Sequence, residues 1–266
     1  MAPIFPHILP VGPALFIPSR GRSLTSIPLF PRYPDTPHSE YGPLRVINED
    51  RVATKTGFGM HTHREFEIFT YVVSGELEHK DSMGNIEILK RGDIQLTSAG
   101  TGISHSEKAH GPTPVHFMQI WARPRIPALK PKYFTRHFTD DEKRDKWARV
   151  VSPVDAPGVP QERDGTGPAP VQSALTLYVT LISEGKAVGQ TMRGAKGFVQ
   201  VIQTSGHNLA DATGATVKIL DADGDEVLLR EGDSAYLEFE DRAGEVKVQI
   251  ENVGDWTAEV LLFDLE

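Results

Sequence analysis

Three histidines and a glutamate stand at spacings that suit a metal site. His61 and His63 are separated by one residue within the stretch from Gly57 to Gly75, where β-branched and aromatic residues alternate as in a strand. Successive side chains of a strand point to opposite faces, so the two imidazoles are expected to converge. His105 and Glu107 repeat this spacing after a glycine-rich loop. The pattern predicts a mononuclear metal site inside a β-barrel.

Glu67 is a further candidate because it falls on the same predicted face as the first two histidines. Three imidazoles with one carboxylate suit iron, nickel, copper, manganese or zinc. Four protein ligands on a six-coordinate ion leave two positions for dioxygen, water or a chelating substrate. A lone His-x-His is more often a pair of structural strand histidines, but the second pair favours metal binding. Packed or exposed positions are expected for His79, His110, His116 and His137.

The composition is that of an ordinary globular chain and excludes several kinds of site. The 266 residues include 28 Lys and Arg against 36 Asp and Glu, which gives a formal charge of -8 and argues against direct nucleic-acid binding. There are no cysteines, so any metal must be held by nitrogen and oxygen ligands. No apolar run has the length of a membrane span, and the start lacks the pattern of a signal peptide. A cytoplasmic location is expected.

The site must be positioned by short strands, because the chain shows few helical patterns. Residues 1–40 are rich in proline and are expected to form an extended arm with one edge strand around Ala14 to Ile17. Residues 41–138 read as short strands between Gly, Asn and Asp turns, and residues 171–266 resume that pattern. A short helix beginning at Thr139 or Asp140 and a Pro- and Gly-rich linker are predicted over residues 139–170.

The second half of the chain repeats features of the first. Leu89–Leu96 resembles Leu229–Leu237, and both contain a Gly-Asp turn between apolar runs. Tyr71–Gly75 likewise resembles Val201–Gly206. Two copies of one all-β unit are therefore expected.

The repeat also predicts where metal is not bound. Placing Gly75 on Gly206 puts Met192 and Gly194 at the positions of the two strand histidines. No histidine follows His207, so the second copy has no pair of ligands. Only the first copy is expected to hold a metal ion.

Five motifs in the first half are similar to those of the pirin family of the cupin superfamily. The resemblance covers residues 42–266 and is strongest up to Trp121. The motifs are Gly42-Pro-Leu-Arg-Val-Ile-Asn-Glu-Asp, His61-Thr-His-Arg, Leu77-Glu-His-Lys-Asp-Ser-Met-Gly-Asn, Gly92-Asp-Ile-Gln and Ala99-Gly-Thr-Gly-Ile-Ser-His-Ser-Glu. Before them, family members carry a fuller segment than the Ser19–Tyr33 stretch found here.

The resemblance implies a bicupin, which is two jelly-roll β-barrels in one chain, with one divalent metal in the N-terminal barrel. The implied metal is Fe(II), with nickel, copper, manganese or zinc as alternatives. The family's ligands fall on His61, His63, His105 and Glu107. Glu67 is then expected to be an acceptor that orients an imidazole.

Two functions follow from the resemblance. The first is a quercetin 2,3-dioxygenase that uses dioxygen to open the ring of a planar phenolic substrate with loss of carbon monoxide, with Glu107 as the general base. The second is an iron-dependent, redox-sensing transcriptional co-regulator that binds protein partners, which would add a nuclear location. A structural metal in a small-molecule-binding barrel is a third reading. The side chains expected to form the core or an apolar mouth are Phe58, Met60, Phe66, Phe69, Met118 and Trp121.

Overall fold

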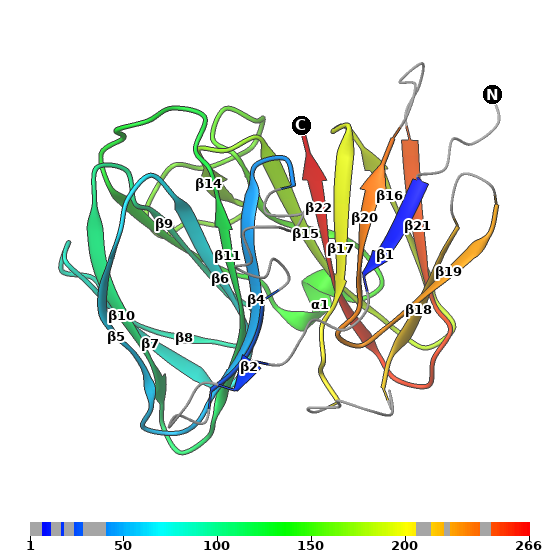
Figure 1. The fold of residues 1–266 in the computed structure, drawn as a ribbon, viewed down its shortest axis with the longest axis horizontal. Helices are drawn as coiled ribbons and strands as arrows, with labels where there is room; N and C mark the ends of the chain where they lie inside the picture. The colour runs from blue at the N-terminus through cyan, green and yellow to red at the C-terminus, as the bar shows by residue number, and fades with distance from the viewer. Residues whose placement is uncertain are drawn as a thin grey trace. The chain divides into compact units, whose positions relative to one another are not determined.

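The protein is seen in a computed structural model that describes residues 7–11, 17–18, 24–28, 41–205, 214–220, 224–239 and 246–266 (Figure 1). The chain divides into two compact units. The N-terminal barrel contains Leu15–Phe138 and Ser152–Ala174, and the C-terminal barrel contains Met1–Ala14, Thr139–Val151 and Leu175–Glu266. Nearly all regular structure in the described residues is antiparallel β-strand, which confirms the all-β bicupin expected from the sequence. The boundaries of 1–40, 41–138, 139–170 and 171–266 stay predictions.

The N-terminal barrel is built from two sheets. The larger has the order β12-β9-β6-β11-β4-β3-β2, and the smaller has the order β5-β10-β7-β8. The strands are β2 (Ile17–Pro18), β3 (Leu24–Pro28), β4 (Leu44–Val52), β5 (Gly57–His63), β6 (Glu67–Ser74), β7 (Glu76–Asp81), β8 (Ile86–Lys90), β9 (Asp93–Ser98), β10 (Ile103–His110), β11 (Val115–Ala122), β12 (Lys132–His137) and β14 (Ala169–Val171). Alternate residues of β10 are buried, beginning with Ile103, so this strand turns His105 and Glu107 into the barrel.

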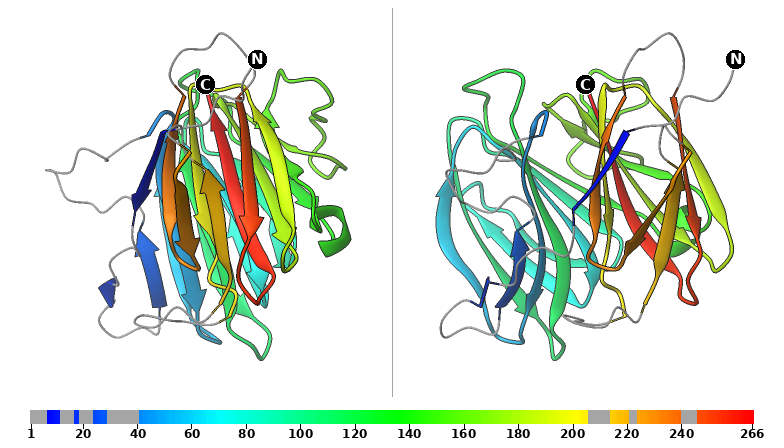
Figure 2. Two further views of the ribbon diagram at one scale, coloured as in Figure 1. Left: turned by 90° about the vertical axis from the view of Figure 1, so that its right-hand side faces the viewer. Right: turned by 45° about the vertical axis from the view of Figure 1, so that its right-hand side comes forward.

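The C-terminal barrel repeats this arrangement. In its larger sheet the strands of this unit run β1-β20-β17-β22-β15-β13, and its smaller sheet runs β16-β21-β18-β19. The strands are β1 (His7–Val11), β13 (Ala148–Pro153), β15 (Leu175–Ile182), β16 (Ala187–Met192), β17 (Lys196–Val201), β18 (Thr216–Leu220), β19 (Glu226–Arg230), β20 (Ser234–Glu238), β21 (Val246–Asn252) and β22 (Ala258–Leu265). The blue β1, from the start of the chain, pairs with the orange β20 (Figures 1 and 2).

The prediction that one strand-like alternation runs from Gly57 to Gly75 is wrong in one respect. It is two strands, β5 and β6, which belong to different sheets. The chain turns between them at Glu65, whose φ of 58° is in the left-handed region and whose amide donates to the Gly100 carbonyl over 3.0 Å. Alternation therefore does not continue from His63 to Glu67.

The predicted helix is shorter than its sequence pattern. Helix α1 spans Asp140–Lys143, with Thr139 as its N-cap in a reciprocal capping box with Glu142. It stops there because its C-cap, Arg144, is extended with a ψ of 118°, and Asp145 follows with a φ of 53° before β13 begins. No helix in the described part of the chain has the length and apolar character needed to cross a membrane.

The proline-rich start contributes strands to both barrels, so an extended arm describes it only in part. Of the edge strand expected around Ala14 to Ile17, residues 14–16 lie outside the described residues, and Ile17 begins β2. Backbone pairing of β3 with β4 and of β1 with β20 ties this region to the two larger sheets.

Candidate metal centre

A β-bulge sets the direction of the first histidine. In the pairing of β5 with β10, His61 lies opposite His105, but Glu107 lies opposite Phe58. Gly59 and Met60 therefore lie opposite the single residue Ser106, which defines a β-bulge in β5. Because of the extra residue, Phe58 and His61 are three residues apart and still point to the same side of the sheet. The bulge carbonyl of Gly59 is 2.7 Å from His61 Nδ1. A carbonyl only accepts, so Nδ1 donates and, in the neutral ring, Nε2 keeps its lone pair.

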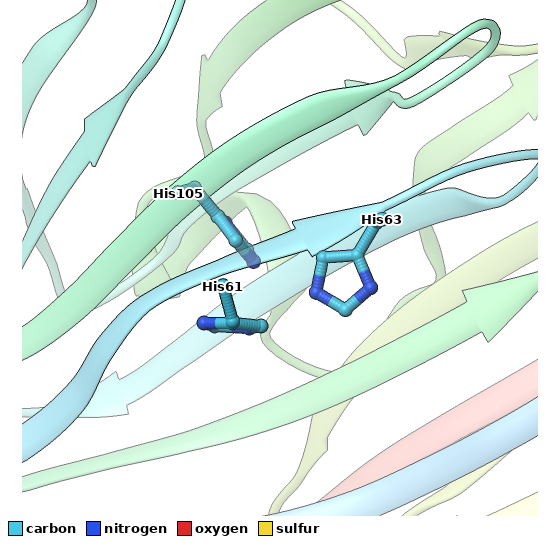
Figure 3. A group of neighbouring side chains, drawn as sticks. All are labelled: His61, His63 and His105. Atoms are coloured by element: carbon cyan, nitrogen blue, oxygen red, sulfur yellow. The ribbon is translucent and has the colours of Figure 1, made fainter.

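The three histidines expected to bind metal come together. The ring centroids are 4.7 Å apart for His61 and His63, 4.6 Å for His61 and His105, and 4.9 Å for His63 and His105. One nitrogen from each ring lies within 4.8 Å of the others. The rings from β5 and β10 point toward a common space (Figure 3). His61 is exposed and the other two are buried, so this space opens on the side of His61.

The electrostatics of these rings fit a metal ion. His63 Nε2 and both ring nitrogens of His105 are buried without a hydrogen-bond partner among the described residues, an arrangement that costs free energy unless a ligand completes it. Burial, followed by repulsion from His105 and His61, lowers the pKa of His63 to about 4. Burial also lowers the pKa of His105. Both rings are neutral near pH 7 and present lone pairs, as metal ligands must.

Glu107 falls in a second group that shares His105 with the first. One atom each of His79, His105 and Glu107 lies within 4.8 Å of the others, and all three side chains are buried. Burial would raise the pKa of Glu107, but the neighbouring His79 and His105 rings and the Gln95 amide outweigh it, so the pKa is lowered and the carboxylate is ionised. Its roles as fourth ligand and as general base stay predictions.

Glu67 lies apart from both groups. Its carboxylate accepts from Ser98 Oγ over 2.5 Å and from the Gln172 amide over 3.1 Å. The expectation that it orients an imidazole is therefore wrong, because the turn after β5 moves it into the other sheet. Burial raises the pKa of Glu67 to about 7, although both hydrogen bonds act in the opposite direction.

His79 is the site neighbour that the spacing did not recommend. It is packed, as expected, but it lies directly opposite Glu107 in the pairing of β7 with β10, with Nδ1 3.8 Å from Glu107 Oε1. Its ring stacks on Tyr133, with centroids 4.9 Å apart, and Nε2 is 3.3 Å from Asp81 Oδ2. The alternation of β7 could have identified His79, because Leu77 and His79 lie two residues apart on the same face of the strand and both are buried.

Two of the other histidines expected to be packed or exposed pair with carboxylates, and His110 is exposed. His116 pairs with Glu49 over 2.8 Å and His137 pairs with Asp93 over 2.6 Å. Among the residues expected to be core or mouth, Trp121 contacts His63 edge-on, with ring centroids 4.7 Å apart. Phe69 and Met118 are fully buried core, and Met60 is 64% exposed.

An all-β chain with two antiparallel barrels and a convergent histidine cluster in one of them is a bicupin of the cupin superfamily. The family model described as Pirin matches residues 30–122. The quercetin 2,3-dioxygenase of Escherichia coli strain K12 is 37% identical over 176 residues, which are 65% of this chain and 71% of that protein. The chain belongs to the pirin family.

Solved structures agree over almost the whole chain. The crystal structure of YhhW from Escherichia coli has a TM-score of 0.76 at 28% identity and covers 97% of both chains. A second structure, described as the bacterial pirin YhhW in complex with nickel(II), has a TM-score of 0.74 at 28% identity and covers 97% of this chain and 98% of that one. A relative from Zymomonas mobilis is 37% identical over 159 residues, and the match spans 64% of its length.

Proposed function

We propose that the protein is a metal-dependent dioxygenase that acts on flavonols such as quercetin. One observation carries the proposal: three histidine rings, one exposed and two buried, converge in the N-terminal barrel, and the buried nitrogens lack hydrogen-bond partners among the described residues. The E. coli relative named quercetin 2,3-dioxygenase supports the reaction class, and the nickel(II) complex of a bacterial pirin supports a divalent ion. Fe(II) is the metal we propose, with nickel, copper, manganese and zinc as alternatives.

The chain's own residues divide the work. His61, His63 and His105 would hold the ion, with Glu107 as the fourth ligand. When bound, the metal supplies Lewis-acid chemistry and open positions for a phenolic oxygen and dioxygen. Because His61 is exposed and its partners are buried, substrate would enter past His61.

Glu107 would take the proton of the substrate hydroxyl. Its lowered pKa keeps the carboxylate ionised near neutral pH, as a general base requires. Each of its oxygens accepts one amide hydrogen, which would leave one lone pair for the metal and one for the proton. Trp121 packs on His63 and limits the rotation of that ring, which keeps the ligands in place.

Oxygen-dependent loss of the flavonol absorbance tests the proposal. The chain, loaded in turn with Fe(II), Ni(II), Cu(II), Mn(II) or Zn(II), is incubated with quercetin with and without dioxygen. We expect turnover only with dioxygen, and none in His63→Ala. Met192→Ala, at the equivalent place in the C-terminal barrel, is the matched control and should keep activity. Absence of oxygen-dependent turnover with all five metals would refute the proposal.

A further inference from the structure

Two glutamine amides hold the buried carboxylate of Glu107. Only 1% of this residue is exposed. Gln95 Nε2 donates to Oε1, and Gln119 Nε2 donates to Oε2 over 2.8 Å. A carboxylate taken out of water without donors is strongly destabilising, so these two amides replace the hydrogen bonds that water would give. We call Gln95 and Gln119 the amide clamp.

The orientation of each amide is fixed from behind. The hydroxyl of Tyr133 donates to Gln95 Oε1 over 3.1 Å, and the hydroxyl of Thr70 donates to Gln119 Oε1 over 2.6 Å. An ionised carboxylate only accepts, so both NH₂ ends must face Glu107, and each carbonyl end then accepts from a hydroxyl. Gln95 Nε2 also donates to Thr70 Oγ1 over 3.0 Å, which joins the two halves of the clamp.

The clamp connects the two sheets of the N-terminal barrel. Gln95 and Gln119 stand on β9 and β11 of the larger sheet, whereas Glu107 stands on β10 of the smaller sheet. Glu107 is thus held at its backbone by one sheet and at its carboxylate by the other. In the C-terminal barrel the strand pairings put Ala235 and Leu262 at the places of the two glutamines, and both belong to an apolar core. The clamp is present only in the barrel with the histidine cluster.

We propose that Gln95 and Gln119 are positioning residues that fix the Glu107 carboxylate beside His105, so that a divalent metal at the three histidines binds tightly only while the clamp is intact. The inference rests on the metal site of the proposed function. Partners that orient a ligating side chain are commonly worth 10–100-fold in metal affinity, and the clamp supplies this orientation through two bonds.

Metal titration of clamp variants tests the inference, with Ni(II) followed by calorimetry and Co(II) followed by its visible spectrum. We expect Gln95→Leu and Gln119→Leu to weaken binding by about 10–100-fold. Their Co(II) spectra should shift toward that of Glu107→Gln. Because the clamp acts through Glu107, adding Gln95→Leu to Glu107→Gln should change affinity by less than about twofold. Gln95→Met, closer in shape, is the second variant if Gln95→Leu does not fold.

Gln200→Leu is the matched control, since Gln200 is also buried and donates through Nε2 to a backbone carbonyl, but in the C-terminal barrel. It should leave metal affinity unchanged. Folded clamp variants that bind metal as tightly as the wild type would overturn the inference and leave the proposed function standing. If Gln95→Leu also weakened metal binding in the Glu107→Gln background, the inference would be overturned, because the effect would not act through the carboxylate. A wild type that binds no divalent metal would overturn both proposals.

Discussion

The two barrels share one strand plan but fill their interiors differently. β4 to β11 correspond in order to β15 to β22, and β12 next to β9 corresponds to β1 next to β20. Even the Gly-Asp turns match. Asp93 accepts from the Lys90 amide over 2.8 Å, and Asp233 accepts from the Arg230 amide over 2.9 Å.

Equivalent positions follow from the strand pairings. Where the N-terminal barrel has His63, His79, His105 and Glu107, the C-terminal barrel has Met192, Ile219, Val248 and Ile250. Where it has Thr70, Gln95 and Gln119, the C-terminal barrel has Val199, Ala235 and Leu262. These seven C-terminal residues belong to one apolar core. The same backbone thus supports either a packed core or a polar site, and side chains alone decide which.

The pairings also correct the sequence alignment by two residues. Met192 stands at the place of His63 and Gln190 at that of His61, rather than Met192 and Gly194 at the places of His61 and His63. The alignment was anchored on Gly206, which lies outside the described residues. A shift of two residues leaves each side chain on the same face of the strand. The conclusion that β16 has no histidine pair is therefore unchanged.

The largest expected effect comes from moving the carboxylate into the other barrel. Ile250→Glu should lower the free energy of unfolding by about 3–5 kcal/mol, because the new charge is buried without a clamp, at a place where Ala235 and Leu262 replace the two glutamines. Urea denaturation followed by circular dichroism measures it. Ile250→Val controls for the change in side-chain size, and it should lower the free energy of unfolding by about 1 kcal/mol. A loss below that value for the glutamate variant would contradict the comparison.

Glu67 and Lys196, its equivalent in the C-terminal barrel, should differ in their effect on how the free energy of unfolding depends on pH. Burial raises the pKa of Glu67 to about 7, so the folded state binds its proton more tightly than the unfolded state. Stability from this group is therefore greatest below about pH 4.5 and falls as pH rises toward 7, by up to about 3 kcal/mol.

Glu67→Gln should remove that fall, as seen in unfolding free energies at pH 5 and pH 8. Lys196→Gln is the control and should keep the wild-type slope between these pH values. Equal slopes in the wild type and Glu67→Gln would show that Glu67 does not titrate in this range.

Removing one proposed ligand should abolish tight metal binding, whereas the equivalent change in the C-terminal barrel should not. His105→Ala deletes a ring shared by both groups, and a loss of about 100-fold or more in affinity is expected, beyond the usual effect of an orienting partner. Val248→Ala, at the equivalent place, should leave metal content unchanged and cost about 1–3 kcal/mol of stability through the cavity. Metal analysis of both purified variants decides between these outcomes. Full metal content in His105→Ala would refute the site.

The smallest effects are expected at the matched turns. Asp93→Ala and Asp233→Ala each remove one acceptor of a backbone amide and should cost about 1 kcal/mol. Asp93→Ala should cost slightly more, since Asp93 also pairs with His137. Thermal unfolding measures both. A much larger loss at Asp233 would show that the two turns are not equivalent.

The sequence by itself determined the features that depend on neighbours in the chain. Alternation placed the strands and turned His61 and His63 to one side, and the spacing of His105 and Glu107 predicted two further ligands, of which His105 joins the other two histidines. The strands expected within residues 171–266 include β15 (Leu175–Ile182) and β18 (Thr216–Leu220), and Thr139 caps the helix as expected. These signals are local, because side-chain direction and capping are set within a few residues.

Only the tertiary structure decided how distant strands meet. The turn at Glu65 removed Glu67 from the site, the register of β7 on β10 brought His79 to Glu107, and the bulge at Gly59 aimed His61. The clamp joins glutamines from β9 and β11 to a carboxylate on β10. Register and side-chain hydrogen bonds between sheets depend on pairings across long separations in the chain, and no local pattern encodes them.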